Sequence, residues 1–438
     1  MFSPLALLVI LYVPLLALYV VSSATIFAEE FESRKALTWT GFAFFALALL
    51  CFAAGAKAGD DGARANRHAA AGRSGAWKLS PAQRRSLAVL LEVALVLSIL
   101  AYVIWFARGF ANAGGIVQFF EIWRSEPHRI KAEIMTTVPG VTTLTQLSVA
   151  AIPLAIAFKL FRRDSAIRVL VIVVFLLTAT RAVLFNERLA LVELLLPILF
   201  LIAVPRRVTV HRVAVYALAF VLAAITFFAA TELRRTYVYT GDFSASSATT
   251  RFFGYYLTSV NNGMVVVDEY PARTPLYSSS QFLWEFPGVR DLRVEHFPGV
   301  DTVSLRYVDA FGIDPESFWP RAFRAQGLDY EFNVFTAPGY LAADFGWAGL
   351  LGIFVLGLIS GKLYRRSEAS PFHRALYAVW LVGLLEFMRI LYFTDTRVFP
   401  AYLVFLAAYV VVRRRAPLGA QRATRVADPR QPARGATG

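Results

Sequence analysis

The stretch IRVLVIVVFLLTATRAVLFNERLALVELLLPILFLIAV, residues 167–204, decides the fold class. It holds two apolar runs, Ile167–Phe185 and Leu189–Val204, joined by a short turn that contains Glu187. Each run is near the roughly 20 apolar residues that a helix needs to cross the hydrocarbon core of a bilayer. Backbone groups in lipid must be satisfied within their own segment, so we expect both runs to be transmembrane helices.

Similar apolar runs recur along the whole chain, which is 57% hydrophobic and has a mean hydropathy of +0.55. This composition is too apolar for an ordinary soluble domain. We predict an all-α polytopic membrane protein with about ten transmembrane helices. The predicted spans are Leu5–Phe27, Thr38–Ala56, Leu87–Ala107, Val141–Phe158, Ile167–Phe185, Leu189–Val204, Val213–Thr231, Tyr340–Ser360, Ala375–Tyr392 and Val398–Val412.

One long hydrophilic segment interrupts the series between the seventh and eighth predicted spans. The chain then divides into four parts: a seven-span bundle at 1–231, a large loop at 232–339, a three-span bundle at 340–412 and a basic tail at 413–438. The tail is rich in Pro, Arg and Ala, which is typical of a disordered segment.

The net charge of +14 is concentrated in every second predicted loop and in the tail. Basic residues gather at 57–85, 159–163, 206–212, 362–374 and 413–434. The positive-inside rule assigns these segments to the cytoplasm, so we expect both termini inside and the large loop outside. Orientation and attraction to anionic lipid explain the charge, and nucleic acid is excluded as a partner.

The residue types that bind metals and cofactors are sparse. Cys51 is the only cysteine, and the five histidines show no metal-ligand spacing. The chain has no P-loop and no Gly-rich dinucleotide turn. We therefore expect no metal and no cofactor, and the missing nucleotide motif argues against a primary pump.

Arginines near the predicted outer ends of the helices are candidates for binding an anionic group. Arg181 and Arg188 are seven residues apart, so a continuing helix would place both on one face. Two guanidinium forks suit a diphosphate. The alternative is that they reach the headgroups or pair with Glu187. Three further arginines, each of which could instead anchor a loop, extend the set: Arg235, Arg251 and Arg397.

Acidic residues accompany these arginines. Glu386 and Arg389 are three residues apart, and we expect them to neutralise each other on a helix. Glu193 lies within a predicted span and should hydrogen-bond inside the bundle. The large loop is rich in aromatic residues, which suit sugar rings but equally suit a membrane-interface belt or a local core.

The stretch NVFTAPGYLAADFGWAGLLGIFVLGLISGKLY, residues 333–364, leads back into the membrane. It resembles the late region of the O-antigen polymerase (Wzy) family, the oligosaccharide repeat-unit polymerases of bacterial surface polysaccharides. The outer turn with Arg181 and Arg188 is similar to that family's arginine-bearing loop. The residues that carry the main resemblance are Asn333-Val334-Phe335-Thr336, Tyr340, Asp344-Phe345-Gly346, Gly349, Gly357 and Lys362.

The resemblance implies a GT-C-like helical bundle in the bacterial inner membrane. It implies two undecaprenyl-diphosphate-linked oligosaccharides as substrates at the outer leaflet, with the growing chain transferred from one lipid onto the sugar end of the other. It implies neither a nucleotide sugar nor a metal. A chain-length regulator and a flippase are the further partners that it implies, beside membrane lipid.

Such a transfer needs a general base within hydrogen-bond reach of the acceptor hydroxyl. Glu187 and Asp395 each have an arginine close by in sequence, which should lower the pKa and weaken a base. Asp344 and Glu232 flank the large loop, although Asp344 could instead cap a helix. These four carboxylates are the candidate catalytic residues.

Two other functions fit the same pattern. An O-antigen ligase-like transferase would move the glycan from the same lipid onto a different acceptor. A flippase or transporter of a lipid-linked glycan should show paired broken helices and charges at mid-membrane. Here most charges gather at the predicted outer ends of the helices.

Overall fold

The computed structural model describes residues 2–70, 79–126, 129–136, 138, 140–184, 187–203, 245–285, 293–294, 303–304, 307–328 and 334–413. Within these ranges the regular structure is helical, apart from one antiparallel pair of short strands. β1 (Arg293–Val294) pairs with β2 (Val303–Ser304). The predicted helical class is confirmed for these residues, whereas the seventh predicted span and the tail lie outside the described residues.

The N-terminal part starts with short helical turns and ends in a long helix. Its elements are α1 (Pro4–Leu7), η1 (Leu8–Tyr12), α2 (Val13–Val21), α3 (Ala24–Phe31) and α4 (Trp39–Ala70). The side chain of Ser23 accepts the N–H of Ile26 and so caps α3. The first apolar helix therefore ends at Val21, inside the predicted span Leu5–Phe27, because Ser23 starts a new helix.

The middle part contains the two helices on which the fold class was predicted. Its elements are α5 (Pro81–Asn112), α6 (Ile116–Ser125), η3 (Ile130–Ile134), α8 (Val141–Leu144), α9 (Leu147–Ala157), α10 (Leu160–Arg163), α11 (Ser165–Leu184) and α12 (Arg188–Ala203). Ser80 and Gln83 form a capping box that starts α5. Helix α9 contacts α5, α12, α20 and α21, and it is apolar on all sides, as expected for a helix inside a bundle.

The C-terminal part contributes the elements that surround the site. They are α14 (Ala245–Glu269), η4 (Ser278–Ser280), α15 (Gln281–Glu285), α16 (Tyr307–Phe311), α17 (Pro315–Ala325), α18 (Ala337–Phe345), η5 (Gly346–Ala348), α19 (Gly349–Ser367), α20 (Pro371–Leu385), η6 (Tyr392–Thr394) and α21 (Phe399–Arg413). The second half of α14 is buried against α18, α4 and α2. The predicted loop region thus contains a helix that belongs to the core.

Helices α4 and α19 approach each other through glycine. A Cβ atom built on Gly55 would lie 2.1 Å from the carbonyl oxygen of Phe354, and one on Gly361 would lie 2.0 Å from that of Ala56. Small residues where two membrane helices cross let the backbones of the helices approach each other closely. This contact joins the N-terminal helices to the C-terminal bundle.

Several apolar helices indicate a membrane-embedded, polytopic protein. Among the described residues, five segments are long and apolar enough to cross a membrane: Pro4–Val21, Trp39–Ala63, Pro81–Asn112, Ser165–Leu184 and Ala337–Ser367. Shorter apolar helices follow at Val141–Ala157, Leu189–Ala203, Pro371–Leu385 and Phe399–Arg413. Each of these segments overlaps a predicted span, and the total of ten spans stays a prediction.

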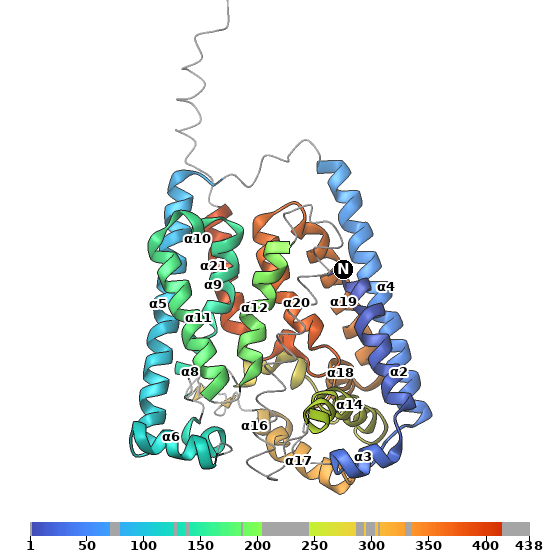
Figure 1. Cartoon of the computed structure of the whole chain (residues 1–438). Helices are drawn as coiled ribbons and strands as arrows, with labels where there is room; N and C mark the ends of the chain where they lie inside the picture. Colours follow the sequence, from blue (N-terminus) through green and yellow to red (C-terminus); the bar gives the residue numbers. More distant parts are fainter. Residues whose placement is uncertain are drawn as a thin grey trace, which may run out of the picture.

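The two ends of the bundle differ in what they carry. The C-terminal end of α4 and the N-terminal end of α5 lie at the same end of the bundle as α10 (Figure 1). Helices α3, α6, α16 and α17 lie at the opposite end of the bundle (Figure 1). Arg162 and Arg163 belong to α10, and Arg365 at the end of α19 lies 3.9 Å from Asp60 of α4. Clusters of basic residues thus collect at the α10 end, and the segments around the site collect at the other.

Candidate functional site

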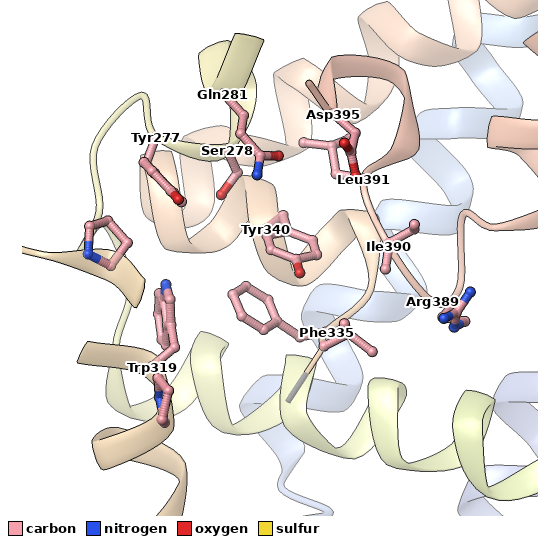
Figure 2. A pocket seen from close by; sticks show the side chains of 13 residues that line it. Tyr277, Ser278, Gln281, Trp319, Phe335, Tyr340, Arg389, Ile390, Leu391 and Asp395 are labelled. Carbon is pink, nitrogen blue, oxygen red and sulfur yellow. The ribbon is translucent and has the colours of Figure 1, made fainter. Parts of the chain in front are cut away.

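A pocket of about 360 Å³ opens between α17, the chain entering α18 and the hairpin that links α20 to α21 (Figure 2). The hairpin, residues 386–398, follows the end of α20. The pocket is lined by Tyr277, Ser278, Gln281, Pro315, Trp319, Pro320, Val334, Phe335, Tyr340, Arg389, Ile390, Leu391 and Asp395.

The entry to α18 is fixed by three hydrogen bonds that involve neighbouring segments. Thr336 caps α18 by accepting the N–H of Gly339 at 3.1 Å. Asn262 of α14 donates its side-chain amide to the carbonyl of Val334 at 3.1 Å, and Ala337 donates its N–H to the carbonyl of Phe387 at 2.9 Å. These contacts hold the Val334 side of the pocket against both α14 and the hairpin.

Aromatic rings form one wall of the pocket. Phe335 stacks on Tyr340 with ring centroids 3.9 Å apart, and Trp319 of α17 lies 4.8 Å from Phe335. Helix α17 turns Trp319 and Phe323 inward together, and both are buried. Rings of this kind bind the C–H faces of sugars, and Tyr and Trp add a polar group at the edge.

The charged residues among those that line the pocket are Asp395 and Arg389. Arg389 pairs with Glu386 at 2.7 Å, which confirms the predicted pair, but both residues lie in the turn after α20 and not on a helix. Its guanidinium also lies 5.7 Å from the centre of the Tyr255 ring. Its Nε is buried and has no hydrogen-bond partner among the described residues. Arg389 thus keeps one N–H that could donate to an anionic oxygen of a ligand, provided that its side chain turns toward that ligand.

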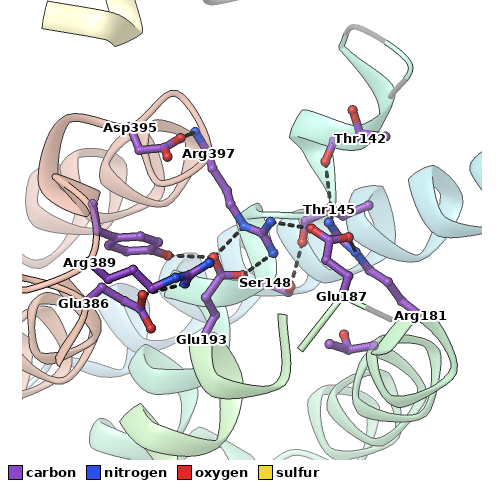
Figure 3. Close-up of polar contacts among 12 residues, drawn as sticks. Thr142, Thr145, Ser148, Arg181, Glu187, Glu193, Glu386, Arg389, Asp395 and Arg397 are labelled. Carbon is purple, nitrogen blue, oxygen red and sulfur yellow. Dashed lines mark hydrogen bonds and ion pairs between the residues drawn. The ribbon is translucent and has the colours of Figure 1, made fainter. Parts of the chain in front are cut away.

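Next to the pocket, Arg397 is the centre of a buried ion cluster (Figure 3). Its Nε and Nη2 atoms donate to the two carboxylate oxygens of Glu193 at 2.5 and 2.9 Å. Its Nη1 donates to Glu187, and the hydroxyl of Tyr392 donates to Glu193 at 2.9 Å. Glu193 is 1% exposed, so the predicted hydrogen bonding of this acid inside the bundle is confirmed.

Arg181 completes the cluster from the end of α11. Its Nε lies 2.5 Å from Glu187, and its Nη1 lies 3.3 Å from the hydroxyl of Thr145. The guanidinium also lies 4.7 Å from the centre of the Trp105 ring, and Arg181 is only 5% exposed. The alternative prediction, that Arg181 pairs with Glu187, is therefore confirmed.

The turn residues of this cluster have shifted pKa values. Burial alone would raise the pKa of Glu187. The guanidinium groups of Arg397 and Arg181 have the larger, opposite effect, so its pKa lies well below the ordinary value. A carboxylate held in this way is a poor general base, as the sequence predicts. Burial raises the pKa of Asp395, and the N–H of Arg397 only partly opposes the shift.

Asp344 has a different environment from Asp395. Its two carboxylate oxygens accept the backbone N–H groups of Ser278 and Ser279 at 3.1 and 2.6 Å. Asp344 is 2% exposed and is not among the residues that line the described pocket. The alternative prediction, in which Asp344 caps a helix, agrees with this geometry, because the two serines begin η4.

The remaining predicted site residues cannot be placed. Glu232 and Arg235 lie outside the described residues. Arg188 begins α12 and Arg251 lies in α14, but their side chains are not described.

The sequence does not identify the roles of two candidate residues. It predicts only that Arg389 neutralises Glu386, and it does not link Glu193 to Arg397. A charged residue inside an apolar run was the available signal for Glu193.

The pocket and the cluster meet at residues 395–397, where Asp395 accepts the backbone N–H of Arg397 at 2.7 Å. No family model, no curated protein and no solved structure matches this chain. The function of the chain is therefore inferred from its residues and from the resemblance described above.

Proposed function

We propose that this protein polymerises lipid-linked oligosaccharide repeat units into a surface polysaccharide. The observation that carries the proposal is one pocket, at the end of the bundle opposite the basic turns, that combines a carboxylate, a guanidinium and stacked aromatic rings. A glycan needs aromatic faces, a departing diphosphate needs positive charge, and an acceptor hydroxyl needs a base.

In the proposed reaction, Asp395 accepts the proton of the acceptor sugar hydroxyl. The freed oxygen forms a bond with the anomeric carbon of the donor glycan, and the bond between that carbon and the diphosphate oxygen breaks. Undecaprenyl diphosphate leaves with the electron pair. Arg389, one of the residues that line the pocket, stabilises the negative charge on the leaving group.

This assignment ranks the predicted arginines differently. Arg181 and Arg397 are already neutralised by Glu187 and Glu193, so they are weaker candidates for holding a diphosphate. Arg389 takes first place because it lines the pocket and, although it pairs with Glu386, its Nε has no hydrogen-bond partner among the described residues. Roles for Arg188, Arg235 and Arg251 stay predictions.

The proposal includes a location and partners. We place the chain in the bacterial inner membrane with about ten spans, both termini in the cytoplasm and the pocket at the outer leaflet. The basic α10 end would then face the cytoplasm, in agreement with the positive-inside rule. A flippase that delivers the lipid-linked glycan and a chain-length regulator are the expected partners.

The test is a reaction of the purified protein with a short undecaprenyl-diphosphate-linked glycan. Longer lipid-linked chains support the proposal. Product that forms only with a foreign acceptor indicates a ligase, and no covalent change indicates a transporter. Asp395→Asn should lower the rate by about 10²–10⁴-fold, the usual range for a general base, with donor binding largely kept. Glu269→Gln, which changes an exposed acid at the end of α14, is the control and should polymerise normally.

A further inference from the structure

Asp395 lies on a turn that has a hydrogen bond to a neighbouring element on one side and an internal hydrogen bond on the other. The hydroxyl of Thr394 donates to the carbonyl of Ser278 at 2.7 Å, which joins the turn to η4. On the other side, the backbone N–H of Arg397 donates to Asp395 at 2.7 Å. The direction of the Asp395 carboxylate therefore depends on where the backbone of Arg397 is held.

The backbone of Arg397 is held through its side chain. The guanidinium meets Glu193 with two hydrogen bonds, a fork geometry that fixes orientation as well as distance. Glu193 projects from α12, a helix packed on α20, α9 and α11. Tyr392, in the same hairpin as Asp395, donates to the same carboxylate. Two side chains of the hairpin thus converge on one buried acid of a rigid helix.

We propose that Glu193 is a positioning residue that directs the Asp395 carboxylate into the pocket by clamping Arg397 and Tyr392. The proposal rests on the proposed function for the role of Asp395, but the clamp itself is independent of it. The ion cluster around Arg397 would then serve to position the hairpin and not to bind a diphosphate. Glu193 and Asp395 both contact Arg397, so the rate losses caused by substituting them should not be additive.

The first test measures the position of the turn without measuring activity. Ser278→Cys and Thr394→Cys are combined in a Cys51→Ser background, and the rate of disulfide formation is followed under mild oxidation. Glu193→Gln should slow the cross-link by about an order of magnitude, because one of the two acceptor oxygens becomes an NH₂ donor that faces a guanidinium N–H. Tyr392→Phe, a milder change, should slow it less. Glu92→Gln is the matched control, since it removes another intramembrane carboxylate, and it should have no effect.

The second test compares transfer rates in a double-mutant cycle. Glu193→Gln alone should lose about 10²-fold, the size expected for a misplaced reacting group. Combined with Asp395→Asn, it should be no slower than Asp395→Asn alone, because the base it positions is already gone. A merely structural role would multiply the two losses.

The outcomes separate this proposal from the proposed function. An unchanged cross-linking rate in Glu193→Gln, or multiplicative losses in the cycle, overturns the positioning role while leaving the polymerase proposal intact. If the unmodified protein forms no transfer product, the polymerase proposal fails, and the cross-linking rates still decide whether Glu193 holds the turn.

Discussion

Arg397 donates its backbone N–H to the carboxylate of Asp395 at 2.7 Å but directs its guanidinium away, onto Glu193 (Figure 3). Proximity in sequence suggests that the arginine cancels Asp395 as a base. In the structure the positive charge is instead shared between Glu193 and Glu187, two carboxylates on the other side of the side chain. Burial raises the pKa of Asp395 by more than Arg397 lowers it, which answers the objection to Asp395 as a base.

The pH dependence of transfer should report this environment. A base acts only when ionised, so the rate should fall as the pH drops through the pKa of Asp395. Burial raises that pKa, so the acidic limb of the rate profile should lie above the value of about 3.9 for an ordinary Asp. Initial rates between about pH 4 and pH 8 measure it. Asp395→Glu should move the limb, and a limb that stays in place would assign it to another group, such as the diphosphate.

Asp344→Asn should act on stability rather than on the chemical step. The carboxylate accepts the N–H groups of Ser278 and Ser279, and an asparagine would turn its NH₂ group toward one of them. Leaving a buried donor unpaired costs about 1–3 kcal/mol. Thermal unfolding in detergent should therefore shift down for Asp344→Asn and much less for Asp395→Asn. Equal shifts, or an Asp344→Asn protein with full stability and no activity, would return Asp344 to the catalytic candidates.

The sequence predicts those parts of the structure that depend on local pattern. Apolar runs of sufficient length predict the helices, and a spacing of three residues predicts the pair between Glu386 and Arg389. The contact between Arg397 and Glu193 is not predictable in this way, because 204 residues separate the partners. Neither is the role of Asp344, since its partners are backbone N–H groups of a short turn far along the chain.

Arg181→Ala should destabilise the protein, because it removes one of the two arginines that pair with Glu187 among the described residues and empties a site beside Trp105. Removing one partner of a buried ion pair costs about 3–5 kcal/mol of stability. Because Glu187 is partly exposed, we expect a loss near the lower limit of this range. The double variant Arg181→Ala/Glu187→Gln should recover part of it. Thermal unfolding of the single and double variants measures the coupling. If Arg181→Ala instead keeps full stability and loses donor binding, Arg181 binds the diphosphate as the sequence first indicated.

Gly357→Ala should prevent the normal packing of α4 against α19. A Cβ atom at Gly357 would lie 2.3 Å from the carbonyl oxygen of Phe52, and backbone on both sides leaves little room to adjust. Overpacking of this kind costs about 1–3 kcal/mol, and more where backbones must separate. Gly62→Ala is the control on α4, because nothing lies within 4 Å of its added atom. Size-exclusion chromatography in detergent should show less folded Gly357→Ala protein and an unchanged amount of Gly62→Ala. Equal amounts of both would contradict the close contact.

The orientation can be tested with two alanines that are both exposed and lie at opposite ends of the bundle. Ala325 ends α17 beside the pocket, and Ala369 follows the basic end of α19. In a Cys51→Ser background, Ala325→Cys should react with a membrane-impermeant thiol reagent in intact cells. Ala369→Cys should react only after the membrane is opened, because the positive-inside rule puts the α10 end in the cytoplasm. The reverse labelling pattern would place the pocket in the cytoplasm, away from a glycan carried on the outer leaflet, and would end the polymerase proposal.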